Sequence, residues 1–266
     1  EQGGFAVIAA DDLVPEVLGV SMSKYSEGQN ENFKWWLEAI QGAVQYAVQH
    51  NVKLNTIAPD PNKYPTEVGP LMTTKWDQDE PFNDLLPQSI YGGQCITGCV
   101  ATAMAQVLNY YKVPVSGIGT RTIYYPQYNT SGTPITANFG DHVYDWDNML
   151  DEYAYGNYNE AQVNAVATLM RDCGVAADMQ YGGSNYTENG SGAYSTEAAA
   201  GLRTYFGIAD AECLERDYYS DADWMDKVYT ALSEDGPIYY GGASYSSGGH
   251  AFVLHGYRAD GMVYVN

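Results

Sequence analysis

The chain has 266 residues, of which 45% are hydrophobic and 17% charged, a composition typical of a globular protein with a sizeable buried core. Lys and Arg number 12 against 33 Asp and Glu, for a formal net charge of −21, which argues against nucleic acid or an anionic membrane surface as a partner. No apolar run approaches the roughly 20 residues that span a bilayer. The first residues lack the basic and apolar regions of a signal peptide, which is therefore absent or already removed.

Residues 1 to about 67 are expected to form a small α/β unit. Its predicted elements are strands over 3–12 and 17–23 and a helix over 30–50. Asn30 or Asn32 can cap the start of that helix. Four prolines between residues 55 and 70 then indicate a linker.

A larger unit starts near Val68 and changes character along its length. Apolar residues at helical spacing predict helices over 98–112, 158–174, 195–207 and 221–236. Alternating apolar residues near the end predict strands over 237–244, 250–257 and 262–266, the last two joined by a turn over 258–261. Helices followed by an antiparallel sheet indicate an α+β fold.

Local signals set the expected ends of these helices. Pro114 ends the first, and Gly174 stops the second. Ser195 is expected to cap the third, and Asp221 or Asp223 the fourth. Gly-, Asn- and Tyr-rich stretches are expected to form loops over 115–145 and 181–195.

Cys95 and Cys99 lie four residues apart, and their chemistry must be chosen among several kinds of site. Zinc sites usually need a second ligand pair, and the four histidines are scattered along the chain. A redox pair needs two intervening residues, whereas three separate these cysteines. Four cysteines are also too few for a disulfide scaffold of this length. We therefore expect no metal site here.

Cys99 is well placed to act as a nucleophile. It follows Gly98 and opens a predicted helix, where unpaired backbone N–H groups favour a thiolate and can bind an oxyanion. Gly98 leaves space for a substrate backbone. The competing interpretation is that Cys99 is simply a small buried residue, which is the commoner fate of a lone cysteine.

A nucleophilic thiol needs a base that a third group orients. His250 begins a strand directly after Gly248 and Gly249, and Asn266 ends the following strand. The order Cys, His, Asn, with the thiol on a helix and the base on a sheet, is the papain-like arrangement. Taken singly, a strand histidine and a terminal asparagine are more often structural.

Four segments resemble the streptopain family, a papain-like group of secreted bacterial cysteine peptidases. The nucleophile helix of that family is similar to "TGCVATAMAQVLNYYKVP", and its base segment to "PIYYGGASYSSGGHAFVLHGYRADGMVYVN". The entry to the mature domain is similar to "TTKWDQDEPFNDLLP", and the inhibitory propeptide to "GGFAVIAADDLVPEVLGVS". The resemblance runs in blocks from residue 3 to residue 266.

The resemblance implies a secreted, extracellular bacterial endopeptidase without a cofactor, acting on proteins or peptides with an apolar residue two positions before the scissile bond. It makes Cys99 the nucleophile, His250 the general base and Asn266 the residue that orients it. Gln94 is expected to complete an oxyanion hole with the start of the Cys99 helix. The implied substrate-binding residues are Gly98, Gly248, Gly249 and Ser195, the last at the end of the loop 184–195. Cys95 has no assigned role, and Cys173 and Cys213 either pair with each other or remain thiols.

The same resemblance divides the chain into a partial inhibitory propeptide over 1–67 and a papain-like domain over 68–266. That domain is expected to be incomplete at its C-terminal end, because the family continues with "W-G-W-G-G" after the asparagine. The propeptide is expected to act as an intramolecular inhibitor. The segment expected to lie near the catalytic histidine and to block or displace it comprises Asn30, Glu31, Asn32 and Phe33.

Two other functions remain open from the sequence. A related acyltransferase or transglutaminase would use the same thiol and imidazole with an amine acceptor. A secreted binding module without catalytic activity would explain the acidic, Tyr-rich composition and leave Cys99 buried.

Overall fold

The structure is a computed structural model that describes residues 3–25, 31–127, 129, 131–183, 190–244 and 248–266. The helices are α1 (Glu31–His50), α2 (Cys99–Tyr111), α3 (Glu160–Ala176), α4 (Ser195–Tyr205) and α5 (Asp221–Glu234), with short 3-10 turns η1 (Trp146–Asn148) and η2 (Arg216–Tyr218). The strands are β1 (Phe5–Ile8), β2 (Val17–Ser21), β3 (Thr120–Tyr125), β4 (Thr133–Asn138), β5 (Ile238–Ser244), β6 (Gly248–Tyr257) and β7 (Val263–Val265). The fold is α+β, as the sequence predicts.

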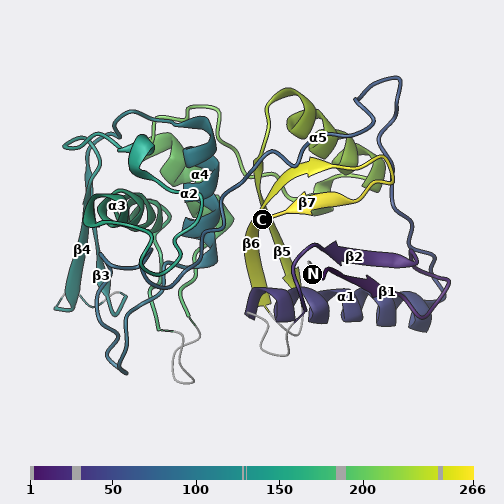
Figure 1. Cartoon of the computed structure of the whole chain (residues 1–266), viewed down its shortest axis with the longest axis horizontal. Coiled ribbons are helices and arrows are strands. Elements are labelled where there is room, and N and C mark those ends of the chain that lie inside the picture. Colours follow the sequence, from purple (N-terminus) through teal and green to yellow (C-terminus); the bar gives the residue numbers. More distant parts are fainter. Residues whose placement is uncertain (1–2, 26–30, 128, 130, 184–189, 245–247) are drawn as a thin grey trace.

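The elements form two halves with the N-terminal unit against one of them (Figure 1). One half contains α2, α3 and α4 beside the β3–β4 hairpin, and the other contains α5 beside the sheet β5–β6–β7. After Val68, the chain crosses from the second half to the first: Leu71 N–H donates to the His255 carbonyl, and Lys75 N–H donates to the Asp151 carbonyl. This crossing segment therefore lies where the two halves meet.

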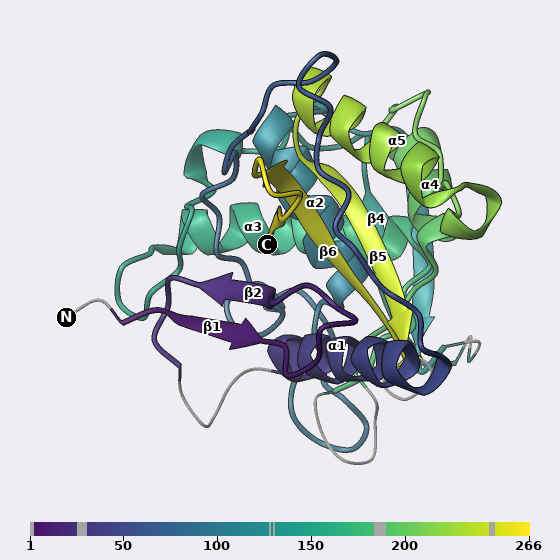
Figure 2. The ribbon, with the colours of Figure 1, turned by 90° about the vertical axis from the view of Figure 1, so that its right-hand side faces the viewer.

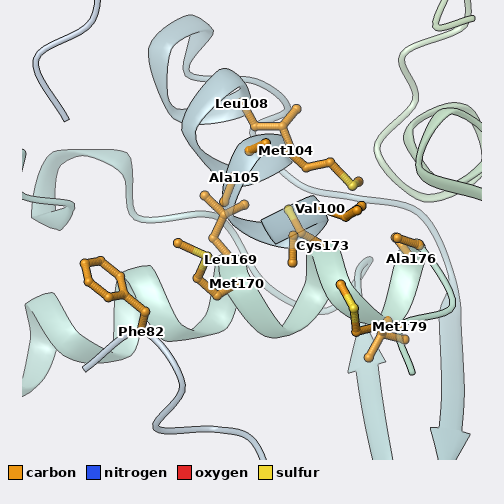
Figure 3. Close-up of a cluster of buried hydrophobic side chains, with 14 of the residues drawn as sticks. Phe82, Val100, Met104, Ala105, Leu108, Leu169, Met170, Cys173, Ala176 and Met179 are labelled. Carbon is orange, nitrogen blue, oxygen red and sulfur yellow. The ribbon is translucent and has the colours of Figure 1, made fainter. Parts of the chain in front are cut away.

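The main core lies between α2 and α3 (Figure 3). Met104 and Leu108 of α2 face Leu169 and Met170 of α3, and all four side chains are at most 3% exposed. Burying a side chain of this size stabilises a protein by about 1.5–3 kcal/mol. The start of α2, which carries Cys99, is therefore anchored by one of the best-packed parts of the molecule.

The second half is built on an antiparallel sheet in the order β5–β6–β7. His250 pairs with Gly242 of β5, and Leu254 pairs with Val265 of β7. The predicted turn between β6 and β7 closes with a hydrogen bond from Gly261 N–H to the Arg258 carbonyl. Because successive side chains of a strand point to opposite faces, neighbours on β6 serve different surfaces.

The N-terminal unit is a β1–β2 hairpin beside α1, and α1 runs past the lower ends of β5 and β6 (Figure 2). Phe5 packs edge-on against Phe33, and Phe33 stacks on Trp36. Trp36 also approaches Gly19 of β2 so closely that a Cβ there would lie 2.4 Å from its ring. The predicted apolar stripe of this helix thus makes the unit's own small core.

One predicted loop proves to be regular structure. Residues 115–145 contain the β3–β4 hairpin, in which Ile123 pairs with Ile135 and Tyr125 with Thr133. Thr and Tyr favour strands, and here buried and exposed positions alternate along both strands. The prediction of a loop was wrong because the Gly and Asn content of the stretch obscured this alternation.

Three predicted helix ends also differ. Helix α3 continues through Gly174 to Ala176, and the glycine is needed because a Cβ there would lie 2.0 Å from the Tyr181 hydroxyl. Helix α5 is capped by Ser220, whose hydroxyl accepts from Asp223 N–H, and not by an aspartate. The residue before α4 is Tyr194, so Ser195 is the first helical residue and not the cap. The proposed cap Asn30 lies outside the described residues.

Candidate active site

Cys99, His250 and Asn266 line one cleft of about 900 Å³. The nucleophile helix α2 contributes Cys99, Thr102, Ala103 and Gln106 to its wall, which is one face of a helix at positions i, i+3, i+4 and i+7. The sheet contributes His250 and Asn266. The three residues that the sequence selects are therefore gathered in one place, although they come from both halves of the molecule.

The start of α2 depends on Gly98. Its φ of 84° and ψ of 142° are accessible to glycine and strained for other residues. A Cβ at this position would also lie 2.8 Å from Met179 Sδ and 3.0 Å from the Ser191 carbonyl oxygen. The side of Gly98 where a Cβ would stand is therefore filled by the protein, and the glycine is needed to place Cys99 at the first turn of the helix.

Opposing influences act on the Cys99 thiol. Burial is the larger and raises its pKa above the ordinary value. Backbone N–H groups of Ala251, Val100 and Cys99 itself donate toward the sulfur and lower the pKa in part. Val100 and Cys99 belong to the start of α2, and Ala251 belongs to β6. In this conformation burial prevails and favours the protonated thiol.

The described contacts of the His250 ring are with α1. The ring lies against the indole of Trp35 from α1, with ring centroids 5.3 Å apart, and the Trp35 indole N–H donates to the Gly248 carbonyl at 3.1 Å. Among the residues that the structure describes, no hydrogen bond joins His250 to Cys99 or Asn266. Burial lowers the pKa of His250, which favours the neutral imidazole. In this conformation the imidazole is therefore in contact with Trp35 and is not hydrogen-bonded to the thiol.

Asn266 is fixed by its backbone and by its side chain. Its N–H and carbonyl exchange two hydrogen bonds of 2.9 Å with Val253 of β6. Its side-chain Nδ2 donates to the Thr74 carbonyl oxygen at 2.6 Å. The amide is therefore oriented even though His250 is not in contact with it.

The structure places Gln94 elsewhere. Its Nε2 donates to the carbonyl oxygens of Asn83 at 3.0 Å and Leu86 at 2.7 Å, and its Oε1 accepts from Gln88. These bonds use both amide hydrogens inside the 83–94 loop, and Gln94 lines a second, separate hollow. The expected contribution to an oxyanion hole is not made in this structure, because the amide has no hydrogen left to donate.

The remaining predicted substrate residues are not among the described residues that line the cleft. Gly248 has a φ of 72°, and a Cβ built at Gly248 or Gly249 would meet no atom closer than 3.8 Å. Ser195 shares a hydrogen bond of 2.9 Å with the Tyr239 hydroxyl. Burial raises the pKa of Tyr239 to about 12, and the nearby Cys99 adds to the rise. Ser195 thus lies at the β5 side of Cys99, while the first half of its predicted loop, 184–189, is outside the described residues.

The contact with His250 comes from a residue that the sequence analysis missed. The predicted inhibitory segment includes Asn30, which is not described, and Phe33, which packs within the N-terminal unit. Asn32 lines the cleft, but it is Trp35 that lies on the imidazole. A signal was available: adjacent helical residues differ by about 100° in direction, so Trp35 could not share the inner stripe with Trp36.

Cys95, Cys99, Cys173 and Cys213 all lie in the described ranges, and none of them forms a disulfide there. Cys95 and Cys173 are fully buried, whereas Cys213 is exposed, which fits the alternative of unpaired thiols. No group of three or more acidic, His or Cys side chains within the described ranges is arranged to hold a metal ion. In the same ranges, no helix is long and apolar enough to cross a membrane.

Comparison with known proteins gives a family match over most of the chain. The model of the Peptidase C10 family matches residues 76–266. The thiol protease/hemagglutinin PrtT of Porphyromonas gingivalis is 32% identical over 280 residues, which cover 100% of this chain and 31% of that protein. Streptopain of Streptococcus pyogenes is 31% identical over 284 residues, which cover 99% of this chain and 68% of the relative. The chain thus spans less than a third of PrtT and about two thirds of streptopain.

Two solved structures from Prevotella intermedia are also similar. A fragment of prointerpain A is 56% identical, with a TM-score of 0.93 over 99% of this chain and 82% of that chain. The active wild-type interpain A cysteine protease is likewise 56% identical, with a TM-score of 0.75 over 79% of this chain and 85% of that chain. The similarity to a pro-form therefore includes the N-terminal unit as well as the two halves around the cleft.

Proposed function

Because the chain belongs to the Peptidase C10 family, we propose that it is the zymogen of a cysteine endopeptidase, with Cys99 as nucleophile, His250 as general base and Asn266 as the residue that orients the base. The observation that carries this proposal is the shared cleft. It brings a thiol with three backbone donors, an imidazole and an oriented amide to one surface. The similarity to thiol proteases over nearly the whole chain supports the same assignment.

In the proposed reaction, the Cys99 thiolate attacks the peptide carbonyl carbon while His250 is protonated. The carbonyl oxygen becomes an oxyanion and accepts hydrogen bonds from backbone N–H groups at the start of α2. The imidazolium of His250 gives its proton to the leaving amine as the C–N bond breaks. Water, deprotonated by His250, then attacks the thioester, and the C–S bond breaks to release the acid and the thiol. No cofactor takes part.

We propose that the N-terminal unit keeps this enzyme latent through Trp35. Its indole fixes the Gly248 carbonyl and covers the His250 ring. Ala251 donates toward the Cys99 sulfur from the next position of the same strand, so the backbone beside His250 already lies next to the thiol. Release of α1 removes the indole that holds the ring in its present position.

The contacts of the linker support a release point before residue 57. The Tyr229 hydroxyl donates to the Ile57 carbonyl, the Tyr257 hydroxyl donates to the Pro65 carbonyl at 3.0 Å, and Val68 bridges to Tyr257. By contrast, Leu54 N–H bonds back to the N-terminal unit. We propose that residues 57–67 belong with the catalytic domain and that the propeptide ends within 51–56, at least eleven residues earlier than the sequence predicts.

Two finer features of the proposal rest on the family resemblance. We propose that the enzyme is secreted and that it prefers an apolar residue two positions before the scissile bond. A peptide library with that position varied, digested with the released enzyme, tests the preference: equal cleavage of apolar and charged peptides would contradict it.

The proposed activity is tested on the full-length protein with a specific protease site introduced into 51–56 and cut after folding. Cutting should start peptide hydrolysis, and Cys99→Ala should abolish it. Iodoacetamide should label Cys99 in the cut protein in preference to the exposed Cys213. Absence of both hydrolysis and Cys99 labelling after cutting would contradict the proposal. If added primary amines divert most of the product to new amides, the enzyme is an acyltransferase instead.

A further inference from the structure

The amide of Asn266 is oriented by contacts that the proposed catalytic group does not include. Asn266 Nδ2 donates to the Thr74 carbonyl oxygen at 2.6 Å. Because an amide group is planar, fixing its nitrogen on one acceptor also fixes its oxygen, and the oxygen remains available as an acceptor. The orientation of the Asn266 amide is therefore set by Thr74, which lies on the segment that crosses between the two halves.

Thr74 is itself held by the nucleophile helix. Its hydroxyl donates to Gln106 Oε1 at 2.7 Å, and the two residues are 6% and 2% exposed. Hydrogen bonds between groups so well buried are costly to break, since water cannot replace the lost partner of either group. Gln106 lies seven residues, or two helical turns, after Cys99 on the face that lines the cleft. A chain of two hydrogen bonds thus runs from the helix of the nucleophile to the side chain of Asn266.

We infer that Thr74 and Gln106 are positioning residues that set the orientation of Asn266 relative to the helix of Cys99. This inference rests on the proposed function. Asn266 and His250 belong to the sheet, and Cys99 belongs to the helical half, so an aligned base requires a connection between the halves. The hydroxyl of Thr74 and the amide of Gln106 make that connection, and Gln106 and Asn266 both line the cleft.

Orientation of Asn266 has a consequence for the active pair. When His250 reaches Cys99 in the released enzyme, the amide oxygen accepts the second imidazole N–H and stabilises the imidazolium. A stabilised imidazolium widens the pH range in which the thiolate and the imidazolium are present together. The acidic end of this range is set by the pKa of the Cys99 thiol, and the alkaline end by the pKa of the His250 imidazolium. Loss of the Thr74–Gln106 hydrogen bond should allow the Asn266 side-chain amide to turn. The pH range over which Cys99 is ionised beside an imidazolium should then narrow at both its acidic and its alkaline end.

The test uses Thr74→Val, which removes the hydroxyl and keeps the shape, in the full-length protein cut within 51–56. We expect kcat to fall about tenfold with KM changed less than twofold, and the pH range of fast Cys99 alkylation to narrow at both ends. Thr74→Ser should restore both. Gln106→Met should reproduce the loss, and the double variant should be no worse than either single one, because both remove the same bond.

Tyr144→Phe is a matched control. It also removes a buried hydroxyl bond, of 2.9 Å to Asp172, far from the cleft lining, and should lower the melting temperature without narrowing the alkylation range. Equal alkylation ranges for Thr74→Val and the parent protein would overturn the inference, as would a loss of kcat that Tyr144→Phe shares. The proposed function fails in a different way, namely if the cut parent protein shows neither hydrolysis nor selective labelling of Cys99.

Discussion

The two walls of the cleft, one formed by α2 and the other by the sheet β5–β6–β7, differ in how far their proposed catalytic groups are already arranged for the reaction. On the helical wall, Cys99 already has its backbone donors and stands on a closely packed helix. On the sheet wall, Asn266 is oriented, but the His250 ring is covered by an indole from the N-terminal unit. The contrast indicates that latency requires only the base to be held away. Under the proposed assignment, the nucleophile and the backbone N–H groups at the start of α2 are already in place before activation.

Removal of either member of the catalytic pair should have the largest effect. Cys99→Ala and His250→Ala should each lower kcat/KM of the released enzyme at least about 10³-fold, since a nucleophile and its base act as a unit. The double variant should be no slower than Cys99→Ala alone. Steady-state kinetics on one peptide measure all three. Substantial residual activity in His250→Ala would show that another group acts as base.

Substitution of Gly98 tests the helical wall. Gly98→Ala forces a side chain into a strained backbone region and against the Ser191 carbonyl, so we expect the free energy of unfolding to fall by about 3 kcal/mol. Gly42→Ala is the control. Gly42 lies within α1 with no atom near its Cβ position, so alanine there should raise the free energy of unfolding slightly. Chemical denaturation measures both. Equal effects of the two substitutions would show that Gly98 does not set the start of α2.

Substitution of Trp35 tests the sheet wall. Trp35→Ala removes one hydrogen bond and the ring contact with His250, which together are worth about 1–2 kcal/mol. The uncut zymogen should therefore label at Cys99 about tenfold faster near neutral pH. Trp35→Phe keeps an aromatic ring beside His250, so the rate of Cys99 labelling should rise less than in Trp35→Ala. An unchanged labelling rate in Trp35→Ala would place the cause of latency in another contact of α1.

Within the linker, residues 51–56 can be compared with residues 57–67, and the expected effect is smaller. Limited proteolysis of the zymogen should cut within 51–56 before it cuts within 57–67, because the later stretch is bonded to α5 and β6. Tyr257→Phe removes the bond to Pro65, worth about 1 kcal/mol, and should increase cutting within 57–67 several-fold. Mass spectrometry of the first fragments identifies the sites. Early cutting after residue 60 in the parent protein would contradict the proposed boundary.

Much of the site could be predicted from local sequence. Cys99 after Gly98, and His250 after two glycines, follow from the chemistry that a thiol and its base need, and the helical spacing of α2 located the main core. What could not be predicted depends on contacts between distant segments. Trp35 contacts His250 although 215 positions of the chain separate them. The side-chain amide of Gln94 donates to carbonyl oxygens of its own loop, which the spacing of apolar residues does not predict.

The clearest test of this account is the pH dependence of Cys99 alkylation in the full-length protein before and after cutting within 51–56. Before cutting, labelling should be slow at neutral pH and accelerate only in alkaline solution, because burial raises the pKa of Cys99 and no imidazolium accompanies it. After cutting, labelling should become fast in mildly acidic and neutral solution, and His250→Ala should abolish that gain. Identical profiles before and after cutting would contradict the claim that the N-terminal unit keeps the base from the nucleophile.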